Sequence, residues 1–281
     1  MEEIYLRDGM ICVVTPEGKC ASMSISEFVD ALAPKRVDTC DVVLPDGIKA
    51  AISRGRVMVL VHQTPPRIHC FRWITLNSPS QFGPETQYRM VRLALPYVVL
   101  LVVFLVGPDS KLLPTSRNEC FFRVAPLEDL DEGGELLYPA LLNCSGYQVQ
   151  DGRPLSWLCT QHLNLAELTG EANPNRSVRR TVRALLHCLF ETGFNYSSEH
   201  HEGSSWFTES RKVDPRIASV ENWEEASNQN PLFVLDVPWL KTGFTVRQVA
   251  ERIFQQTGSA SNGITTEADL ARLILHRRKA V

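Results

Sequence analysis

The chain has 281 residues, of which 44% are hydrophobic and 22% charged, so it is long enough for one large globular domain or two small ones. Its formal net charge of −3 gives no overall basic field that would attract nucleic acid. The eight cysteines are scattered without a CxxC pair, and the acidic start, MEEIYLRDG, carries no apolar signal region. We therefore expect a cytoplasmic, reducing environment in which most of these thiols are buried and reduced.

Residues 1–75 are predicted to form a small β-rich N-terminal domain. Short apolar runs alternate with turns that contain Pro and Gly, which is typical of a compact antiparallel sheet. Ser24 and Glu27 have the spacing of a capping box, so a helix is expected to start there and to stop before Pro34. Residues 76–86 are polar, with two prolines and a glycine, and are interpreted as a linker or loop.

The most apolar run of the chain lies between Leu93 and Val106 and reads LALPYVVLLVVFLV. A membrane-spanning helix needs roughly 20 apolar residues, and this run is shorter, rich in valine and interrupted by Pro96. The pattern favours two strands that are split at the proline, with the second strand buried on both faces. No membrane association is expected.

Residues 87–281 are predicted to form a second domain, in which an antiparallel meander precedes a set of helices. Strands are expected at 89–95, 97–106 and 119–124. The acidic stretch 128–135 is interpreted as a solvated loop.

The clearest helix of the sequence carries apolar residues at spacings of three and four. These residues are Val178, Val182, Leu185, Leu186, Leu189 and Phe190. Arginines lie mainly away from this apolar stripe, namely Arg176, Arg179, Arg180 and Arg183. The basic face has two interpretations, a solvated helix surface or a docking face for an acidic partner protein.

Four further elements are expected towards the C-terminus. A short helix is predicted near 221–226 and a short strand at 232–235. Thr245 is the expected cap of an amphipathic helix that turns its apolar residues between 246 and 254 inward. Residues 265–281 are predicted to form a last helix with a basic end.

The sequence lacks the common signatures of nucleotide, hydrolase and metal chemistry. It has no GxGxxG and no phosphate-binding loop, and Ser204 lies in GSS rather than in a GxSxG elbow. His200-His201 and the pair Cys159-x-x-His162 each fall short of the four ligands that a structural zinc site needs. We therefore expect neither a cofactor nor a metal.

Cys159 stands out as a candidate nucleophile, because it ends a short apolar run after the turn Asp151-Gly152. A thiolate attacks a carbonyl that is presented to it, and the resulting oxyanion needs a hydrogen-bond donor. The side-chain amide of Asn143 can be that donor, and His162 can help to form the thiolate. Each residue also has a plainer interpretation: a buried thiol at a strand end, a turn-forming asparagine and a surface histidine.

The order of these parts resembles the ubiquitin-conjugating enzyme fold, in particular the prokaryotic ubiquitin-conjugating-enzyme-like family D, which includes protein B of the PRTRC genetic system. The resemblance covers roughly residues 87–250 and rests on a series of short features. These are Leu95-Pro96 before the apolar strand, Tyr138-Pro139, Asn143, Asp151-Gly152-Arg153, Cys159 and the helix from Val178.

The resemblance implies an α+β fold, with an antiparallel meander, flanking helices and the β-rich N-terminal unit as an extension. It implies that Cys159 accepts a ubiquitin-like protein as a thioester from a ThiF-type activating enzyme, and that Asn143 stabilises the oxyanion during transfer to a target in a bacterial conjugation pathway. A JAB-type protease from the same operon is a further implied partner. In eukaryotic conjugating enzymes a histidine and a proline precede the asparagine, whereas Leu141-Leu142 precede it here.

Two other functions stay open at this point. The chain is alternatively an inactive scaffold of the same fold that binds the activating enzyme or the ubiquitin-like protein, or a structural or plasmid-maintenance protein without this chemistry. A meander before Cys159 and a long helix after it favour an acceptor thiol over one half of a hydrolytic pair with His162.

Overall fold

The computed structural model divides the chain into two compact units, residues 1–40 with 256–281 and residues 41–255. The residues that it describes are 3–7, 10–14, 18, 20–24, 27, 44–74, 85–107, 111–130, 134–145, 155–160, 163–169, 171, 173–191 and 208–258. The predicted linker or loop at 76–86 does not coincide with this division, and strands on both sides of that stretch pair in one sheet.

The first unit contains a three-stranded antiparallel sheet in the order β1-β2-β3. Its strands are β1 (Glu3–Arg7), β2 (Met10–Val14) and β3 (Cys20–Ser24). Buried residues alternate along β2 and β3 and pair across them, since Ile11 lies opposite Met23 and Val13 opposite Ala21. The predicted capping box is present at the end of β3: Glu27 N–H donates to Ser24 Oγ at 3.1 Å, and Ser24 N–H donates to Glu27 Oε2 at 2.8 Å. Residues 28–34 lie outside the described part of the chain.

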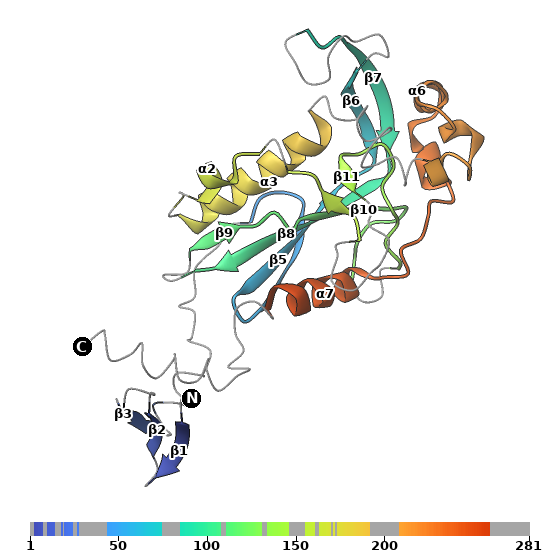
Figure 1. Ribbon diagram of the computed structural model, residues 1–281. Helices are drawn as coiled ribbons and strands as arrows, with labels where there is room; N and C mark the ends of the chain where they lie inside the picture. Colours follow the sequence, from blue (N-terminus) through green and yellow to red (C-terminus); the bar gives the residue numbers. More distant parts are fainter. Residues whose placement is uncertain are drawn as a thin grey trace. The chain divides into compact units, whose positions relative to one another are not determined.

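The second unit is built on an antiparallel sheet with the strand order β11-β12-β10-β8-β5-β4, in which β9 also pairs with β8 (Figure 1). The strands are β4 (Ile48–Arg54), β5 (Val57–Thr64), β8 (Tyr97–Val106), β9 (Leu112–Pro114), β10 (Glu119–Arg123), β11 (Cys144–Ser145) and β12 (Trp157–Leu158). This mixed α+β architecture with antiparallel sheets agrees with the fold class expected from the sequence.

Strand β8 separates two hydrophobic cores, because its side chains alternate between the two faces of the sheet. On one face, Val98, Leu100, Val102 and Phe104 pack with helix α3 (Pro174–Phe190). On the other face, a second set packs with helix α7 (Val246–Gly258), namely Val99, Leu101 and Val103. Figure 1 shows α3 and α7 on opposite sides of this sheet. The strand is therefore buried on both faces, as predicted.

Proline interrupts a long two-stranded ribbon in the middle. Strand β6 (Arg67–Ile74) follows β5 almost directly and pairs with β7 (Tyr88–Leu95), which runs into β8 after Pro96. Pro65 and Pro66 lie opposite Pro96, and none of the three has an N–H for the ladder, so the pairing stops there and resumes on the far side. The predicted split of the apolar run at Pro96 is confirmed. Among the described residues no helix is both long and apolar enough to cross a membrane.

The remaining helical elements are α2 (Leu165–Thr169), η2 (Pro215–Ile217), α6 (Val220–Gln229) and η3 (Pro231–Leu235), the η elements being 3-10 helices. Helix α6 supplies polar partners to the backbone of β7. Trp223 Nε1–H donates to the carbonyl oxygen of Ala94 at 2.8 Å, and the N–H of Ala94 donates to Ser227 Oγ at 2.8 Å. This edge of the hairpin is thus capped by a helix rather than left open.

Helices α3, α6 and α7 confirm the helices predicted from apolar spacing. The apolar residues of α7 point inward as expected, with Val246, Val249, Ile253 and Phe254 all buried. The predicted strand at 232–235 is wrong, because these residues form the 3-10 helix η3 behind the N-cap Asn230 and Pro231. The predicted C-terminal helix at 265–281 lies outside the described residues.

The two cores predict equal sensitivity on both faces of β8. Leu100→Ala and Leu101→Ala each leave a cavity in a different core and are expected to lower the free energy of unfolding by about 2–5 kcal/mol. Leu232→Ala, at a side chain that is 56% exposed, is the matched control and should cost less than about 1 kcal/mol. Urea unfolding measures all three, and a large loss on one face alone would contradict the two-core arrangement.

Candidate functional site

The structure brings together two of the three residues expected at the site. Asn143 immediately precedes β11 and Cys159 immediately follows β12, and these strands pair with Cys144 opposite Leu158. The N–H of Cys159 donates to the carbonyl oxygen of Asn143 at 3.0 Å, and Asn143 Nδ2 donates back to the carbonyl oxygen of Cys159 at 3.2 Å. His162, the third, lies outside the described residues.

Helix α3 closes this site from the side with a second thiol. Cys188 Sγ donates to the carbonyl oxygen of Cys159 at 3.2 Å and accepts from Asn143 Nδ2 at 3.7 Å. Burial raises the pKa of Cys188 to about 12, which keeps it in the thiol form. The exposed fractions of Asn143 and Cys159 are only 4% and 6%, and both amide hydrogens of Asn143 are engaged. In this conformation the site is closed.

The backbone that leads into Asn143 is strained. Leu141 has a φ of 59°, the only positive φ at a non-glycine residue in the described part of the chain. This left-handed conformation costs a branched side chain roughly 1–2 kcal/mol. Leu141 is 2% exposed and belongs to the core under α3, so packing maintains the strain beside the candidate oxyanion donor.

A buried ion pair fixes the segment that enters β12. Glu119 on β10 accepts two bonds from Arg252 of α7, at 2.6 and 2.7 Å, and also accepts from the backbone N–H groups of Leu155 and Ser156. Burial raises the pKa of the Glu119 carboxyl, whereas the Arg252 guanidinium and the two amides stabilise its charged form. Because it accepts four hydrogen bonds from three donor nitrogens, we take Glu119 as ionised. Through this pair, helix α7 fixes the residues that precede β12 and Cys159, from the face of the sheet opposite to α3.

Three signals in the sequence pointed weakly to these neighbours. Cys188 falls between Leu185 and Leu189 in the apolar stripe of its helix, where a cysteine counts as an ordinary core residue. Glu119 opens an otherwise apolar strand, and Arg252 lies directly before the buried Ile253. A charge in an apolar pattern indicates a buried partner, but the sequence does not say which one.

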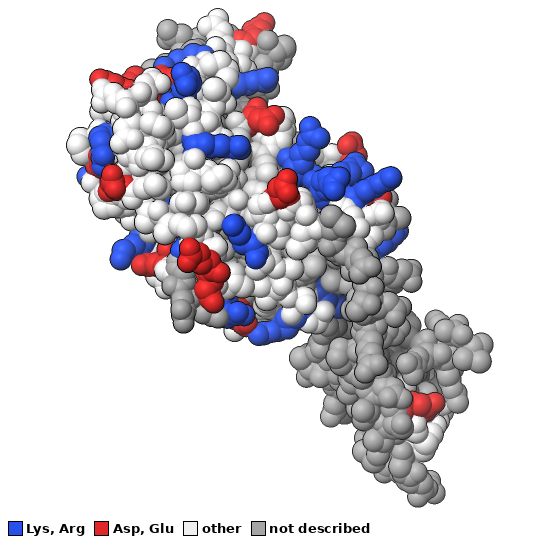
Figure 2. Space-filling view, turned by 180° about the vertical axis from the view of Figure 1, so that it is seen from behind, with Lys and Arg blue, Asp and Glu red and all other residues white. Residues whose placement is uncertain are grey.

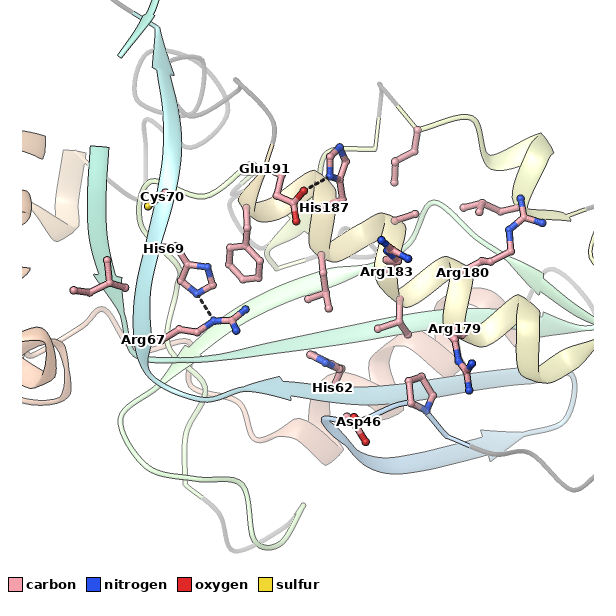
Figure 3. Close-up of a pocket in the computed structure, with 18 residues that line it drawn as sticks. Asp46, His62, Arg67, His69, Cys70, Arg179, Arg180, Arg183, His187 and Glu191 are labelled. Carbon is pink, nitrogen blue, oxygen red and sulfur yellow. Dashed lines mark hydrogen bonds and ion pairs between the residues drawn. The ribbon is translucent and has the colours of Figure 1, made fainter. Parts of the chain in front are cut away.

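A separate pocket of about 930 Å³ lies between α3 and the strands β5 and β6 (Figure 3). Its apolar lining includes Val182, Leu186 and Phe190 of α3 together with Ile68 of β6. Its charged lining is mainly basic and consists of Arg67, Arg179, Arg180 and Arg183, against Asp46 and Glu191. In Figure 2, Lys and Arg side chains gather in one cluster at the position of α3.

Two buried histidines form the sheet side of this pocket. Burial lowers the pKa of His62 and of His69 to about 4, and the charge of Arg67 acts in the same direction. His69 Nε2 accepts from Arg67 Nε at 3.3 Å, and its ring stacks on Phe190 with centroids 4.1 Å apart. Both rings are therefore neutral at pH 7. No local sequence pattern indicates these two histidines, since each is one polar residue within a strand.

The chain was compared with known protein families, with curated proteins and with solved structures, and none of them matches it. Within the described ranges, no three His, Cys, Asp or Glu side chains are grouped so that they could hold a metal ion. The cysteine site and the basic pocket are therefore the two features of the structure that bear on function.

We expect the Glu119–Arg252 pair to stabilise the fold far more than a surface pair does. Glu119→Gln leaves the Arg252 guanidinium, whose side chain is 17% exposed, without its counter-charge, and should cost about 3 kcal/mol of unfolding free energy. The matched control is Glu221→Gln, which breaks the exposed pair with Arg89 and should cost less than about 1 kcal/mol. Equal losses of unfolding free energy in the two variants would show that the buried pair stabilises the fold no more than the exposed pair does.

The depressed pKa values predict a loss of stability in mild acid. The folded state binds a proton on His62 or His69 less tightly than the unfolded chain does, so the stability is fully present above pH 6.5 and falls as the pH drops towards about 4. Between about pH 7 and about pH 5 each histidine should account for about 2 kcal/mol.

His69→Gln should therefore flatten the unfolding profile by that amount, whereas Leu232→Ala, at an exposed side chain that does not titrate, should leave its slope unchanged. The difference between wild type and His69→Gln isolates this histidine from the carboxyl groups that titrate in the same range. Parallel profiles would contradict the assignment.

Proposed function

We propose that this chain is a carrier that accepts a ubiquitin-like protein as a thioester on Cys159 from a ThiF-type activating enzyme and passes it to a target in a bacterial conjugation pathway. The proposal includes a ubiquitin-conjugating-enzyme-like fold for the second unit, with the meander β4-β5-β8-β10 followed by Cys159 and the long helix α3. The resemblance of the sequence to family D of the prokaryotic proteins of this kind suggested it.

The contact between Asn143 and Cys159 is the observation that supports this role best. The two residues are 16 positions apart in sequence, yet they lie at adjacent ends of the paired strands β11 and β12 and exchange two hydrogen bonds. A carboxamide that contacts the backbone of an acceptor cysteine is suited to stabilise the oxyanion that forms when a nucleophile attacks the thioester. The strained Leu141 just before Asn143 is a further feature that functional sites share.

The proposed loading step is a thioester exchange. The Cys159 thiolate attacks the carbonyl carbon of the thioester on the activating enzyme, so a new C–S bond forms while the donor's C–S bond breaks. The departing donor thiolate takes up the proton that Cys159 released. Because the thiol is 6% exposed and the Asn143 amide is fully engaged, loading requires the activating enzyme to open the contact with Cys188.

The same closed geometry favours a second candidate function, the inactive scaffold. Cys159 is only 6% exposed and contacts Cys188, whose pKa is raised by burial to about 12, so its surroundings disfavour a charged thiolate. In this role the fold binds the activating enzyme or the ubiquitin-like protein without a covalent bond. The two candidates differ only in whether Cys159 reacts.

A loading assay separates the two. The full chain is mixed with a purified ThiF-type enzyme, ATP and the ubiquitin-like protein, and adducts are examined on gels with and without thiol reductant. A carrier gives an adduct that reductant cleaves and that Cys159→Ala abolishes. Cys70→Ala, at an exposed cysteine of β6, is the control and should load normally.

Asn143→Ala is expected to load but to discharge to an amine about 10²–10³-fold more slowly, because the oxyanion loses its donor. Co-elution of the proteins without any adduct supports the scaffold. An adduct that persists in Cys159→Ala would refute the assignment of the acceptor, and the absence of both adduct and co-elution would refute the pathway.

A further inference from the structure

The basic pocket beside α3 does not belong to the cysteine site, and its charges are largely uncompensated. Arg67, Arg179 and Arg183 make no ion pair within the described residues, whereas Arg180 lies 3.7 Å from Glu171 and His187 lies 2.8 Å from Glu191. Figure 3 shows Arg67 on the sheet side and Arg183 on the helix side of the same space. A pocket in which several guanidinium groups have no acidic partner among the described residues is suited to bind carboxylate or phosphate.

His62 is a second and independent indication of a ligand. Its side chain lines the pocket, its exposed fraction is 5%, and its Nδ1 atom has no hydrogen-bond partner among the described residues, although the ring bonds the backbone of Asp46. A buried polar atom without a partner costs free energy, so it indicates a group that is supplied from outside. The turn at Gly47 closes the opposite edge of the ring, since a Cβ there would lie 2.5 Å from His62 Nε2. In Figure 3 the ring points from β5 towards the space between Arg67 and α3.

The spacing of the basic residues matches an extended peptide. Arg179, Arg183 and His187 are four residues apart on one flank of α3, so each step rises about 6 Å along the helix. Alternate side chains of an extended strand are separated by about 6.6–6.8 Å. Carboxylates at two alternate positions of such a strand would therefore meet Arg179 and Arg183 in succession, with Arg67 facing them from the sheet side, while the intervening side chains contact the apolar lining. The next residue along the flank, His187, already pairs with Glu191.

We propose that this pocket binds an extended acidic segment of a partner protein, whose alternate carboxylates pair with Arg179, Arg183 and Arg67. The mode is peptide recognition by an arginine cluster, with Val182, Leu186 and Phe190 as the apolar floor. The proposal does not depend on the chemistry of Cys159.

The surroundings of the pocket favour an acidic peptide over nucleic acid. Glu171 and Glu191 lie at the two ends of the basic row, and Asp46 lies on the sheet side. A continuous phosphate backbone would run onto these carboxylates, whereas a short peptide ends before them. The whole chain is also acidic, with a net charge of −3, so it has no long-range attraction for a polyanion.

The test uses the full chain and fluorescein-labelled, end-capped peptides. The acidic probe is Gly-Glu-Leu-Glu-Ser-Glu-Gly, the neutral control replaces each Glu by Gln, and a single-stranded oligothymidylate is the nucleic-acid control. Fluorescence anisotropy gives the dissociation constants at about 50 mM and about 500 mM salt, since screening weakens exposed ion pairs. We expect the acidic peptide to bind more tightly than both controls, and more weakly at high salt.

The double variant Arg179→Gln/Arg183→Gln should weaken the acidic peptide at least about tenfold. Arg176→Gln is the matched control, because Arg176 is exposed on the same helix but does not line the pocket, and it should change the affinity less than about twofold. Circular dichroism and thermal melting of each variant verify that it is folded. The ¹⁵N resonance of His62 Nδ1 in the wild type should shift when the acidic peptide, but not the glutamine peptide, is added.

Four results would overturn the proposal. These are equal binding of the Glu and Gln peptides, equal weakening by Arg176→Gln and by the double variant, tighter binding of the oligothymidylate, and a His62 resonance that does not respond to the bound peptide. The readout does not involve loading of Cys159, so a failure here leaves the carrier proposal untouched and the reverse also holds.

Discussion

The burial of β8 on both faces is the constraint on which the rest of the second unit depends. A strand whose consecutive residues are all apolar has no face for water, so the sheet needs a cover on each side. Helix α3 covers one face and α7 the other, and the two cores meet only through the sheet. The side chains of the neighbouring strand β5 are divided in the same way. Leu60 belongs to the core under α3, whereas Val59 and Val61 belong to the core under α7.

Residues of both covering helices, α3 and α7, determine the surroundings of Cys159. From the α3 side, Cys188 contacts its carbonyl oxygen, and from the α7 side, Arg252 acts through Glu119 on the two residues that enter β12. A buried ion pair is expensive to desolvate, and replacing it by apolar residues is often neutral. Here the carboxylate also binds two backbone N–H groups at the start of a strand of only two residues, which has few ladder bonds of its own. The ion pair therefore holds a segment that sheet pairing alone would hold weakly.

Local patterns in the sequence predicted most helices and the main strands, because apolar spacing and proline act over a few residues. Pro96 marked the break between β7 and β8, and Thr245 the start of α7. The pairing of β5 with β8 was not predictable, because pairing between strands that are far apart in sequence leaves no local pattern, and a linker between domains was therefore predicted at 76–86. The apolar run 232–235 is compatible with a strand or with a short buried helix. The N-cap Asn230 and the following Pro231 favour the 3-10 helix that is observed. At the site, Cys159 and Asn143 were recognisable one by one, whereas the roles of Glu119 and His62 arise only from burial.

Among the described elements, helix α3 alone takes part in both the cysteine site and the basic pocket. Its position is set by apolar contacts such as Leu185 and Leu189, which lie in the core. Cys188 reaches Cys159 and Asn143 from this helix, while Arg183 and His187 line the pocket from it. Because a packed helix moves as a rigid body, a displacement that widens the pocket also changes the distance between the Cys188 thiol and the Asn143 amide. The proposed opening of the thiol site and the proposed binding of a peptide in the pocket therefore both involve helix α3, whichever of the two a partner engages first.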